Sequence, residues 1–187
     1  MFLKLPEAKG GFEAQAFHGS PFYIDKTLEQ FHLPPGVLIQ LAPEVRFVTE
    51  TRFFVAYGCI TAYGPYRING VIWESEGWAE QRDGLHDAEV QRMCSFVEEM
   101  LADPQVDVAP GCTIDVGILE DGTLAVVEAN AAWSSGPYDC DPAGVRAAVK
   151  ASYDFGGDYL EWRWKYPVIH EQVRPLKICV AIMGYYD

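Results

Sequence analysis

The chain has little positive charge and no long apolar run. Its 14 Lys and Arg residues are outnumbered by 27 Asp and Glu residues, which gives a net charge of −13. Nucleic-acid backbones attract Lys and Arg, so no nucleic-acid partner is expected, although a local basic pocket for a small phosphorylated ligand stays open. No apolar stretch reaches the roughly 18 residues of a membrane span, and the N-terminus does not resemble a signal peptide. We therefore expect a soluble, cytoplasmic protein without a membrane partner.

Reactive cysteine and histidine patterns are also scarce. The five cysteines are odd in number, scattered, and without a C-x-x-C pair. This predicts reduced thiols and excludes a disulfide framework or a zinc site. The sequence contains no convincing Ser-His-Asp or Cys-His arrangement, so its four histidines are interpreted as surface or packing residues. Cys140, which lies between two aspartates, is interpreted as a small packing residue.

Hydrophobic residues make up 49% of the 187 residues and aromatic residues 13%, which predicts a globular chain of one domain or of two small lobes sharing a cleft. Alternation and turn residues predict strands at 1–5 and 36–42 and a long β region at 45–68 that turns near Tyr57-Gly58. Apolar spacing predicts helices at 24–31, 86–103 and 142–155, the last with Asp141 as N-cap. The fold class is α+β with a mainly antiparallel sheet and flanking helices.

Residues 113–140, "TIDVGILEDGTLAVVEANAAWSSGPYDC", predict a β-hairpin that carries two acids. Asp121-Gly122 is typical of a two-residue type I′ turn, which would pair Glu120 with Thr123, Ile118 with Ala125 and Val116 with Val127. The same register sets Asp115 opposite Glu128 and Thr113 opposite Asn130, all on one face.

Two carboxylates directly opposite each other in an apolar layer repel each other and are costly to bury. Three responses are open: one acid is protonated, a basic residue intervenes, or a divalent cation bridges them. Asp115, Glu128 and Asn130 supply the oxygen ligands that suit Mg²⁺. The alternative is an ordinary solvated face at the wet end of the sheet.

Basic residues elsewhere would complete a metal–phosphate site. In "VTETRFFV", Glu50, Arg52 and Phe54 share one strand face, and an arginine flanked by phenylalanines suits bidentate binding of phosphate or carboxylate. A structural ion pair of Arg52 with Glu50 or another acid is the alternative. Lys4 stands in a strand and Lys9 in a loop, where a snorkelling and a solvated lysine are the simpler interpretations.

The order of these features resembles the ATP-grasp superfamily, and most closely its small clade named for one arginine and two lysines. A lysine on a strand, a second lysine in a loop, "VLIQLAP", E-x-R, an Asp before a hairpin and E-x-N after it follow one another from Phe2 to Ala148. The similarity is strongest over 113–142, where "VVEANAAWSSGPYDCDP" is similar to the clade's ending.

The resemblance implies two α+β lobes that bind ATP and Mg²⁺. It implies that Lys4 and Lys9 contact phosphates, that Gln40, Leu41 and Ala42 form the hinge beside adenine, and that Arg52 faces the γ-phosphate or the acyl-phosphate. Asp115, Glu128 and Asn130 would hold one or two Mg²⁺ ions, with Arg67 a weaker candidate for the acceptor or phosphate side. The implied division is a remnant of the first lobe and hinge at 1–42, the C-terminal ATP-grasp lobe at 43–156, and an unassigned aromatic tail at 157–187.

The implied reaction is a ligase that joins a small-molecule or peptide carboxylate to an amine acceptor through an acyl-phosphate, with release of ADP. ATP-grasp proteins normally carry an N-terminal lobe before the strand of the first lysine, and that lobe is missing from this sequence. Three explanations stay open: the upstream part is absent, the sequence is a piece of a longer chain, or a protein partner or an oligomer supplies the lobe. Two alternatives stay open: a non-catalytic nucleotide-binding assembly factor, for which Trp162, Trp164, Tyr185 and Tyr186 could form a contact patch, and a kinase with a hydroxyl acceptor.

Overall fold

The computed structural model describes residues 2–4, 15–16 and 40–162. The chain divides into two compact units, one of Met1–Val45 with Tyr166–Asp187 and the other of Arg46–Lys165. Each unit is described by itself. The division at 1–42, 43–156 and 157–187 stays a prediction.

The first unit contains a three-stranded antiparallel sheet in the order β2-β1-β3, with strands β1 (Phe2–Lys4), β2 (Gln15–Ala16) and β3 (Gln40–Ala42). The predicted strand around Lys4 is confirmed, and Lys4 is the register partner of Gln40. The predicted helix at 24–31, the predicted strand before Gln40, and Lys9 lie outside the described residues.

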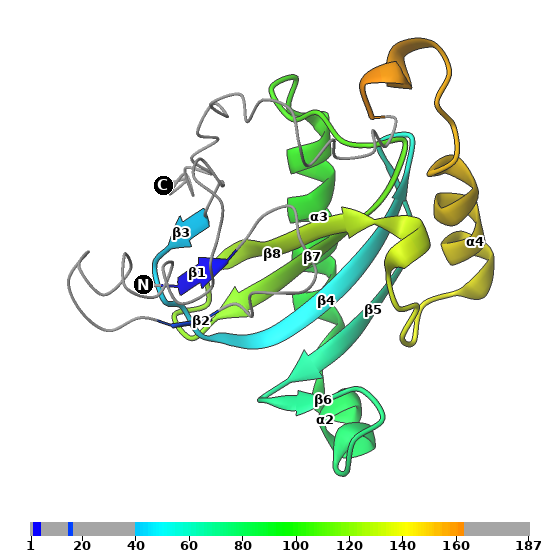
Figure 1. Cartoon of the computed structure of the whole chain (residues 1–187). Coiled ribbons are helices and arrows are strands. Elements are labelled where there is room, and N and C mark those ends of the chain that lie inside the picture. Colours follow the sequence, from blue (N-terminus) through cyan, green and yellow to red (C-terminus); the bar gives the residue numbers. More distant parts are fainter. Residues whose placement is uncertain (1, 5–14, 17–39, 163–187) are drawn as a thin grey trace. The chain divides into compact units, whose positions relative to one another are not determined.

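The second unit is built on a five-stranded sheet in the order β6-β5-β4-β7-β8, in which all neighbours are antiparallel (Figure 1). Its strands are β4 (Phe47–Ala56), β5 (Cys59–Ile68), β6 (Val71–Ile72), β7 (Gly111–Leu119) and β8 (Leu124–Ala131). The predicted turn at Tyr57-Gly58 is confirmed, and both residues have positive φ. The α+β class with a mainly antiparallel sheet is confirmed.

Helices flank this sheet: α2 (Trp78–Gly84), α3 (Asp87–Ala102) and α4 (Pro142–Ala151), with 3₁₀ turns η1 (Ala132–Ser134) and η2 (Gly157–Trp162). At the start of α3, the backbone N–H of His86 donates to the Glu89 carboxylate. At the start of α4, the Asp141 side chain accepts from the Gly144 backbone at 2.9 Å, as expected of an N-cap. The predicted helix at 86–103 is confirmed as α3. The predicted helix at 142–155 is shorter in the structure, because α4 ends at Ala151. Neither β6 nor α2 was predicted.

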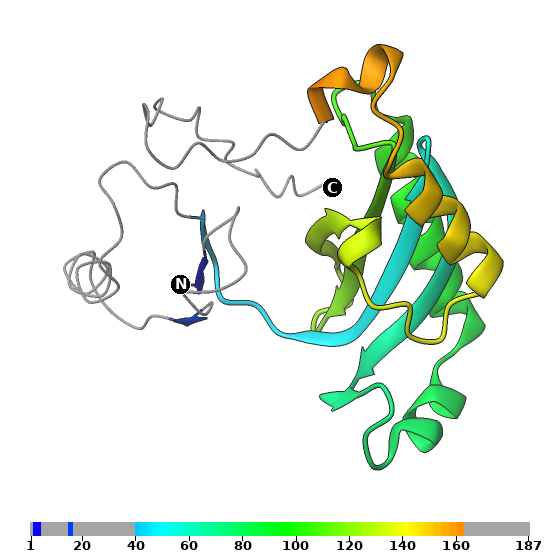
Figure 2. The same ribbon diagram turned by 45° about the vertical axis from the view of Figure 1, so that its right-hand side comes forward.

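The alternation of side chains along the strands divides the core into two layers. Phe53 of β4 belongs to the cluster that α3 covers with Met93 and Val97, whereas its neighbour Phe54 belongs to the cluster that α4 covers with Ala148. The two helices therefore lie on opposite faces of the sheet, and α3 passes behind the strands in Figure 1 while Figure 2 shows α4 from the side. Arg52 lies on the face of Phe54, because strand side chains alternate.

The hairpin of β7 and β8 turns differently from the prediction. The strands end at Leu119 and resume at Leu124, the Gly122 N–H donates to the Leu119 carbonyl at 2.9 Å, and within the hairpin only Gly122 has positive φ. The predicted two-residue type I′ turn is therefore wrong. The Asp121 side chain instead accepts from the Thr123 backbone at 2.9 Å, which favours the wider turn.

A β-bulge then restores the predicted pairing farther along the hairpin. Near the turn, Val116 pairs with Val126 and Ile118 with Leu124, so the predicted partners Val127 and Ala125 are wrong by one residue. The register shifts between Asp115 and Val116, because β8 has one more residue than β7 there. Beyond the bulge, Asp115 pairs with Glu128 and Thr113 with Asn130, as predicted.

Close packing of α4 on β5 predicts a stability effect at Gly144. A Cβ built on Gly144 would overlap the carbonyl of Thr61, whereas a Cβ on Gly84 at the end of α2 would meet nothing within 4 Å. We expect Gly144→Ala to destabilise the protein by about 1–3 kcal/mol, because the backbones of α4 and β5 cannot both stay in place. Gly84→Ala is the control, expected to be neutral or slightly stabilising. Urea denaturation of both variants measures the difference, and equal midpoints would contradict this packing.

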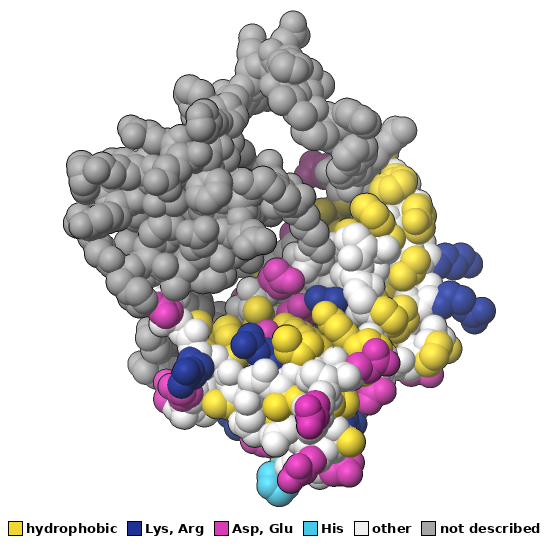
Figure 3. Space-filling view, turned by 60° about the horizontal axis from the view of Figure 1, so that its bottom comes forward, with side chains coloured by type: hydrophobic (Ala, Val, Ile, Leu, Met, Phe, Trp, Pro, Cys, Tyr) yellow, Lys and Arg dark blue, Asp and Glu magenta, His cyan; other side chains and the backbone are white. Residues whose placement is uncertain are grey.

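The surface of the second unit mixes charges of both signs. On the face shown in Figure 3, Lys and Arg side chains are interspersed with acidic and hydrophobic ones, so the described residues form no continuous basic surface there. In the part of the chain that the structure describes, no helix has the length and apolar character needed to cross a membrane.

Candidate functional site

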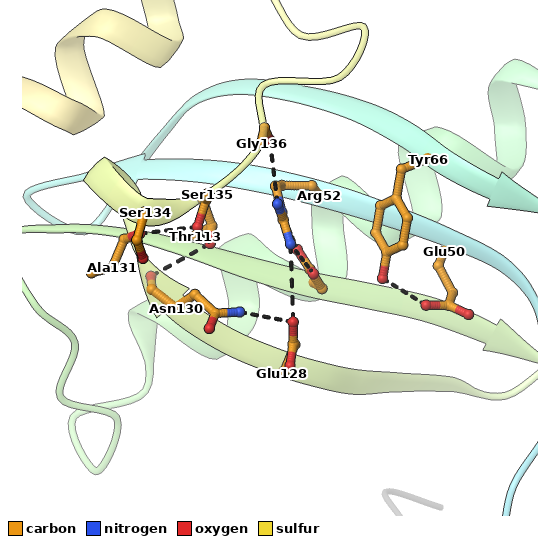
Figure 4. Close-up of polar contacts among 11 residues, drawn as sticks. Glu50, Arg52, Tyr66, Thr113, Glu128, Asn130, Ala131, Ser134, Ser135 and Gly136 are labelled. Carbon is orange, nitrogen blue, oxygen red and sulfur yellow. Dashed lines mark hydrogen bonds and ion pairs between the residues drawn. The ribbon is translucent and has the colours of Figure 1, made fainter. Parts of the chain in front are cut away.

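Three neighbouring strands place polar side chains in a row across the α4 face of the sheet. Arg52 of β4 is the register partner of Asp115 on β7, and Asp115 is the register partner of Glu128 on β8. Figure 4 shows Arg52 and Glu128 pointing toward each other from their strands, with Asn130 beside Glu128. The predicted shared face of Asp115, Glu128 and Asn130 therefore also carries Arg52.

Arg52 and Asp115 form a buried, bidentate ion pair. The Arg52 Nε donates to Asp115 Oδ1 at 2.8 Å and Nη2 donates to Oδ2 at 2.7 Å. Both residues are almost completely buried, with exposed fractions of 6% for Arg52 and 1% for Asp115. Of the three ways to tolerate opposed carboxylates, the structure shows the second, because the guanidinium of Arg52 lies close to both of them.

The charges of this pair depend on each other. Burial opposes the charge of the guanidinium, yet the hydrogen bonds and negative charge of Asp115 outweigh burial and raise the pKa of Arg52. Burial also raises the pKa of Asp115, and Arg52 opposes that rise. Two parallel N–H···O bonds require the carboxylate form, so the pair is ionised in the folded protein.

Glu128 and Asn130 lie at the more accessible end of the row. The Glu128 side chain is 40% exposed, and its Oε1 lies 4.0 Å from Arg52 Nη2. The Asn130 Nδ2 donates to the same oxygen at 2.8 Å, which holds the two side chains of β8 next to each other. The backbone carbonyl of Asn130 and the hydroxyl of Ser135 both contact the Thr113 hydroxyl, at 3.4 Å and 2.8 Å.

Two tyrosines stack around the guanidinium of Arg52, and sequence reasoning missed both of them in this role. The Arg52 Cζ lies 4.9 Å from the ring centroid of Tyr138 and 5.6 Å from that of Tyr66, and the two rings stack at 4.9 Å. The Arg52 Nη1 also donates to the carbonyl of Gly136 at 3.2 Å. A signal was present, because each tyrosine ends a Gly-Pro-Tyr tripeptide, at 64–66 and at 136–138.

Glu50 takes partners of its own, separate from Arg52. Its carboxylate accepts from the Tyr66 hydroxyl at 2.6 Å and from Arg67 Nη1 at 3.0 Å. Burial, the charge of Asp115 and the hydrogen bond to Glu50 raise the pKa of Tyr66, so its hydroxyl stays protonated and donates. The ion pair of Arg52 that was the alternative interpretation therefore exists, but with Asp115 and not with Glu50.

Cys140 packs against this face as a buried side chain. It belongs to the cluster of Phe54 and Ala148, and burial raises the pKa of its thiol to about 12, with a smaller opposing effect of Arg52. A thiol with so high a pKa is a poor nucleophile near neutral pH, which agrees with the packing role expected from the sequence.

The donor atoms of this face fit a hard divalent cation only if Arg52 moves. Asp115, Glu128 and Asn130 together offer two carboxylates and an amide oxygen, the ligand types that Mg²⁺ prefers. Both oxygens of Asp115 are already hydrogen-bonded to Arg52, and the described residues contain no group of three or more His, Cys, Asp or Glu arranged to hold a metal. A cation that uses Asp115 would therefore replace the guanidinium.

The other predicted site residues belong to the first unit. Gln40, Leu41 and Ala42 form β3, and Lys4 lies opposite Gln40 on β1. The predicted phosphate lysine and the predicted hinge segment are therefore neighbours in one small sheet.

Comparison with protein families identifies the chain. A family model of the ATP-grasp domain, family 3 of the clade named for one arginine and two lysines, matches residues 1–149. The chain belongs to this ATP-grasp family. ATP-grasp membership supports ATP binding and a ligase-type function, and domains of this kind typically bind Mg²⁺. No curated protein and no solved structure matches the chain.

The ATP-grasp match covers every residue of the polar row on the sheet. It spans β1, β3 and the whole of β4, β7 and β8, and it therefore includes Lys4, Arg52, Asp115, Glu128 and Asn130. The match ends at residue 149, within α4, so η2 lies beyond the part that resembles the ATP-grasp family.

Proposed function

We propose that this ATP-grasp protein binds Mg²⁺-ATP on the β4–β7–β8 face and joins a carboxylate to an amine through an acyl-phosphate. The observation that carries the proposal is the row of Arg52, Asp115, Glu128 and Asn130 on one sheet face. An arginine fork and a set of hard oxygen ligands are the groups that phosphoryl transfer needs, because its catalysis depends on positioning and charge neutralisation.

Each side chain of the row has a role in this proposal. Arg52 binds the γ-phosphate and then the acyl-phosphate, since its planar fork matches phosphate oxygens. Glu128 and Asn130 are hydrogen-bonded to each other, and together with Asp115 they would bind Mg²⁺. A bound Mg²⁺ neutralises charge on the phosphate oxygens.

In this proposal, Lys4 and Lys9 bind phosphates, and the backbone of Gln40 to Ala42 binds the edge of adenine. The pairing of Lys4 with Gln40 supports this, because it sets the lysine strand beside the hinge strand.

The proposed reaction needs no protein nucleophile. A carboxylate oxygen of the substrate bonds to the γ-phosphorus while the bond from that phosphorus to ADP breaks, which gives the acyl-phosphate. The nitrogen of the amine then bonds to the acyl carbon, the carbon–oxygen bond to phosphate breaks, and the amine loses a proton to solvent. The products are ADP, phosphate and an amide.

Trapping with hydroxylamine tests this reaction without knowledge of the natural acceptor. The full chain is incubated with Mg²⁺-ATP, hydroxylamine and a panel of carboxylic acids that includes hydroxy acids, and we expect ADP together with a hydroxamate of one acid class. A phosphorylated alcohol would instead indicate the kinase alternative. Nucleotide binding with neither product would indicate the assembly factor, and both results would contradict the ligase.

A further inference from the structure

The guanidinium of Arg52 uses all of its nitrogens within the protein. Nε and Nη2 donate to the two oxygens of Asp115, and Nη1 donates to the carbonyl of Gly136. The Nε–Nη2 edge is one of the two forked edges by which a guanidinium binds a phosphate bidentately. Arg52 therefore cannot offer this edge to a phosphate while Asp115 holds it.

The same guanidinium occupies the position of a cation between two carboxylates. It lies at 2.7 Å from Asp115 Oδ2 and at 4.0 Å from Glu128 Oε1, on the face that also carries Asn130. Like charges directly opposite on neighbouring strands are destabilising, so some positive charge is needed there. A divalent cation would supply that charge equally well.

The aromatic contacts of Arg52 do not depend on Asp115. Tyr138 and Tyr66 stack on each other and meet Arg52 through their rings, whereas Asp115 binds its edge. Tyr138 has φ of 46°, unusual for a residue other than glycine, and its ring is met edge-on by Trp73 at 5.7 Å. These contacts can hold the guanidinium against the two rings while its edge turns away from Asp115.

We propose that Arg52 and a divalent cation compete for Asp115, and that binding of the cation frees the edge of Arg52 for a phosphate group. Tyr66 and Tyr138 act as positioning residues that retain the guanidinium during the exchange. Binding of the cation and binding of the phosphate are therefore coupled, because either one alone would have to break the Arg52–Asp115 pair. This inference rests on the proposed function, because it uses the same cation and phosphate site.

Binding of Mn²⁺ in the absence of nucleotide tests the competition. Electron paramagnetic resonance of free Mn²⁺ measures the affinity of the full chain and of two variants. Arg52→Met is expected to bind Mn²⁺ more tightly by about tenfold or more, because a close buried charge pair no longer has to be broken. Arg46→Met, which removes the same charge from an exposed arginine that pairs with Glu120, is the control and should change the affinity by less than about threefold.

Two results would overturn the competition. Affinity that is unchanged or weaker in Arg52→Met would show that Arg52 does not exclude the cation, and an equal gain in Arg46→Met would show a general charge effect. Neither result touches the proposed function, which instead fails if the wild-type protein binds ATP no better with Mn²⁺ than without it.

A measurement on the wild-type protein tests the proposal even if Arg52→Met does not fold. The Nε–H nuclear magnetic resonance signal of Arg52 is assigned by its loss in Arg52→Lys. We expect this signal to shift when Mg²⁺ and a non-hydrolysable ATP analogue are added together, because the donor exchanges Asp115 for phosphate. A signal that stays unchanged while the analogue saturates the protein would overturn the proposal.

Discussion

Glu128→Gln is expected to weaken Mg²⁺-dependent ATP binding by at least about tenfold, since one charged metal ligand is lost. The substitution keeps the shape of the side chain and an oxygen that can accept from the Asn130 amide, as Glu128 does at 2.8 Å. Because the Glu128 side chain is 40% exposed, we expect the free energy of unfolding to change by less than about 1 kcal/mol.

Isothermal titration calorimetry with ATP, in Mg²⁺ and in EDTA, measures this effect. Glu120→Gln is the matched control, since it makes the same chemical change beside the turn of the same hairpin, where Glu120 forms an exposed ion pair with Arg46. Its ATP affinity should equal that of the wild type. Equal affinities for wild type and Glu128→Gln would remove Glu128 from the metal site.

Replacement of Asp115 alone by Leu is expected to destabilise the protein by about 3–5 kcal/mol, because the guanidinium of Arg52 would stay buried without its partner. Arg52 keeps the Gly136 carbonyl at 3.2 Å, the two tyrosine rings and the partly exposed Glu128 carboxylate at 4.0 Å. An exposed pair has no such effect, so Glu120→Leu should cost less than about 1 kcal/mol.

The double variant Asp115→Leu with Arg52→Met separates the pair from its surroundings. Replacing a whole buried ion pair by apolar side chains of similar volume is often neutral, so the double variant should be more stable than Asp115→Leu alone. Urea denaturation of the four proteins in the cycle gives the coupling energy. Simple addition of the two single effects would contradict an ion pair that stabilises the fold only as a unit.

Much of the fold could be predicted because its elements follow from local patterns. The 3.6-residue spacing of apolar residues in α3 and the β-branched and aromatic residues of β4 are properties of short segments, and both elements formed as expected. The turn of the β7–β8 hairpin was predicted less well, because Asp121-Gly122 is compatible with more than one turn type. The predicted pairing of Asp115 with Glu128 is nevertheless correct, because the bulge offsets the longer turn.

The partner of Arg52 could not be predicted from the sequence. Arg52 and Asp115 are separated by 63 positions, and only the pairing of β4 with β7 brings them together. Glu50, two residues away on the same strand face, was the closer acid in sequence, but Arg67 and Tyr66 occupy it. Tyr138 was missed for a similar reason, because its stacking on Tyr66 depends on how the 136–140 loop crosses the sheet.

A crystal structure of the full chain with Mg²⁺ and a non-hydrolysable ATP analogue would show where the metal and the phosphates bind. We expect the terminal phosphate on the freed edge of Arg52 and the metal on Glu128, Asn130 and Asp115. A triphosphate bound elsewhere, with the Arg52–Asp115 hydrogen bonds unchanged, would contradict this expectation.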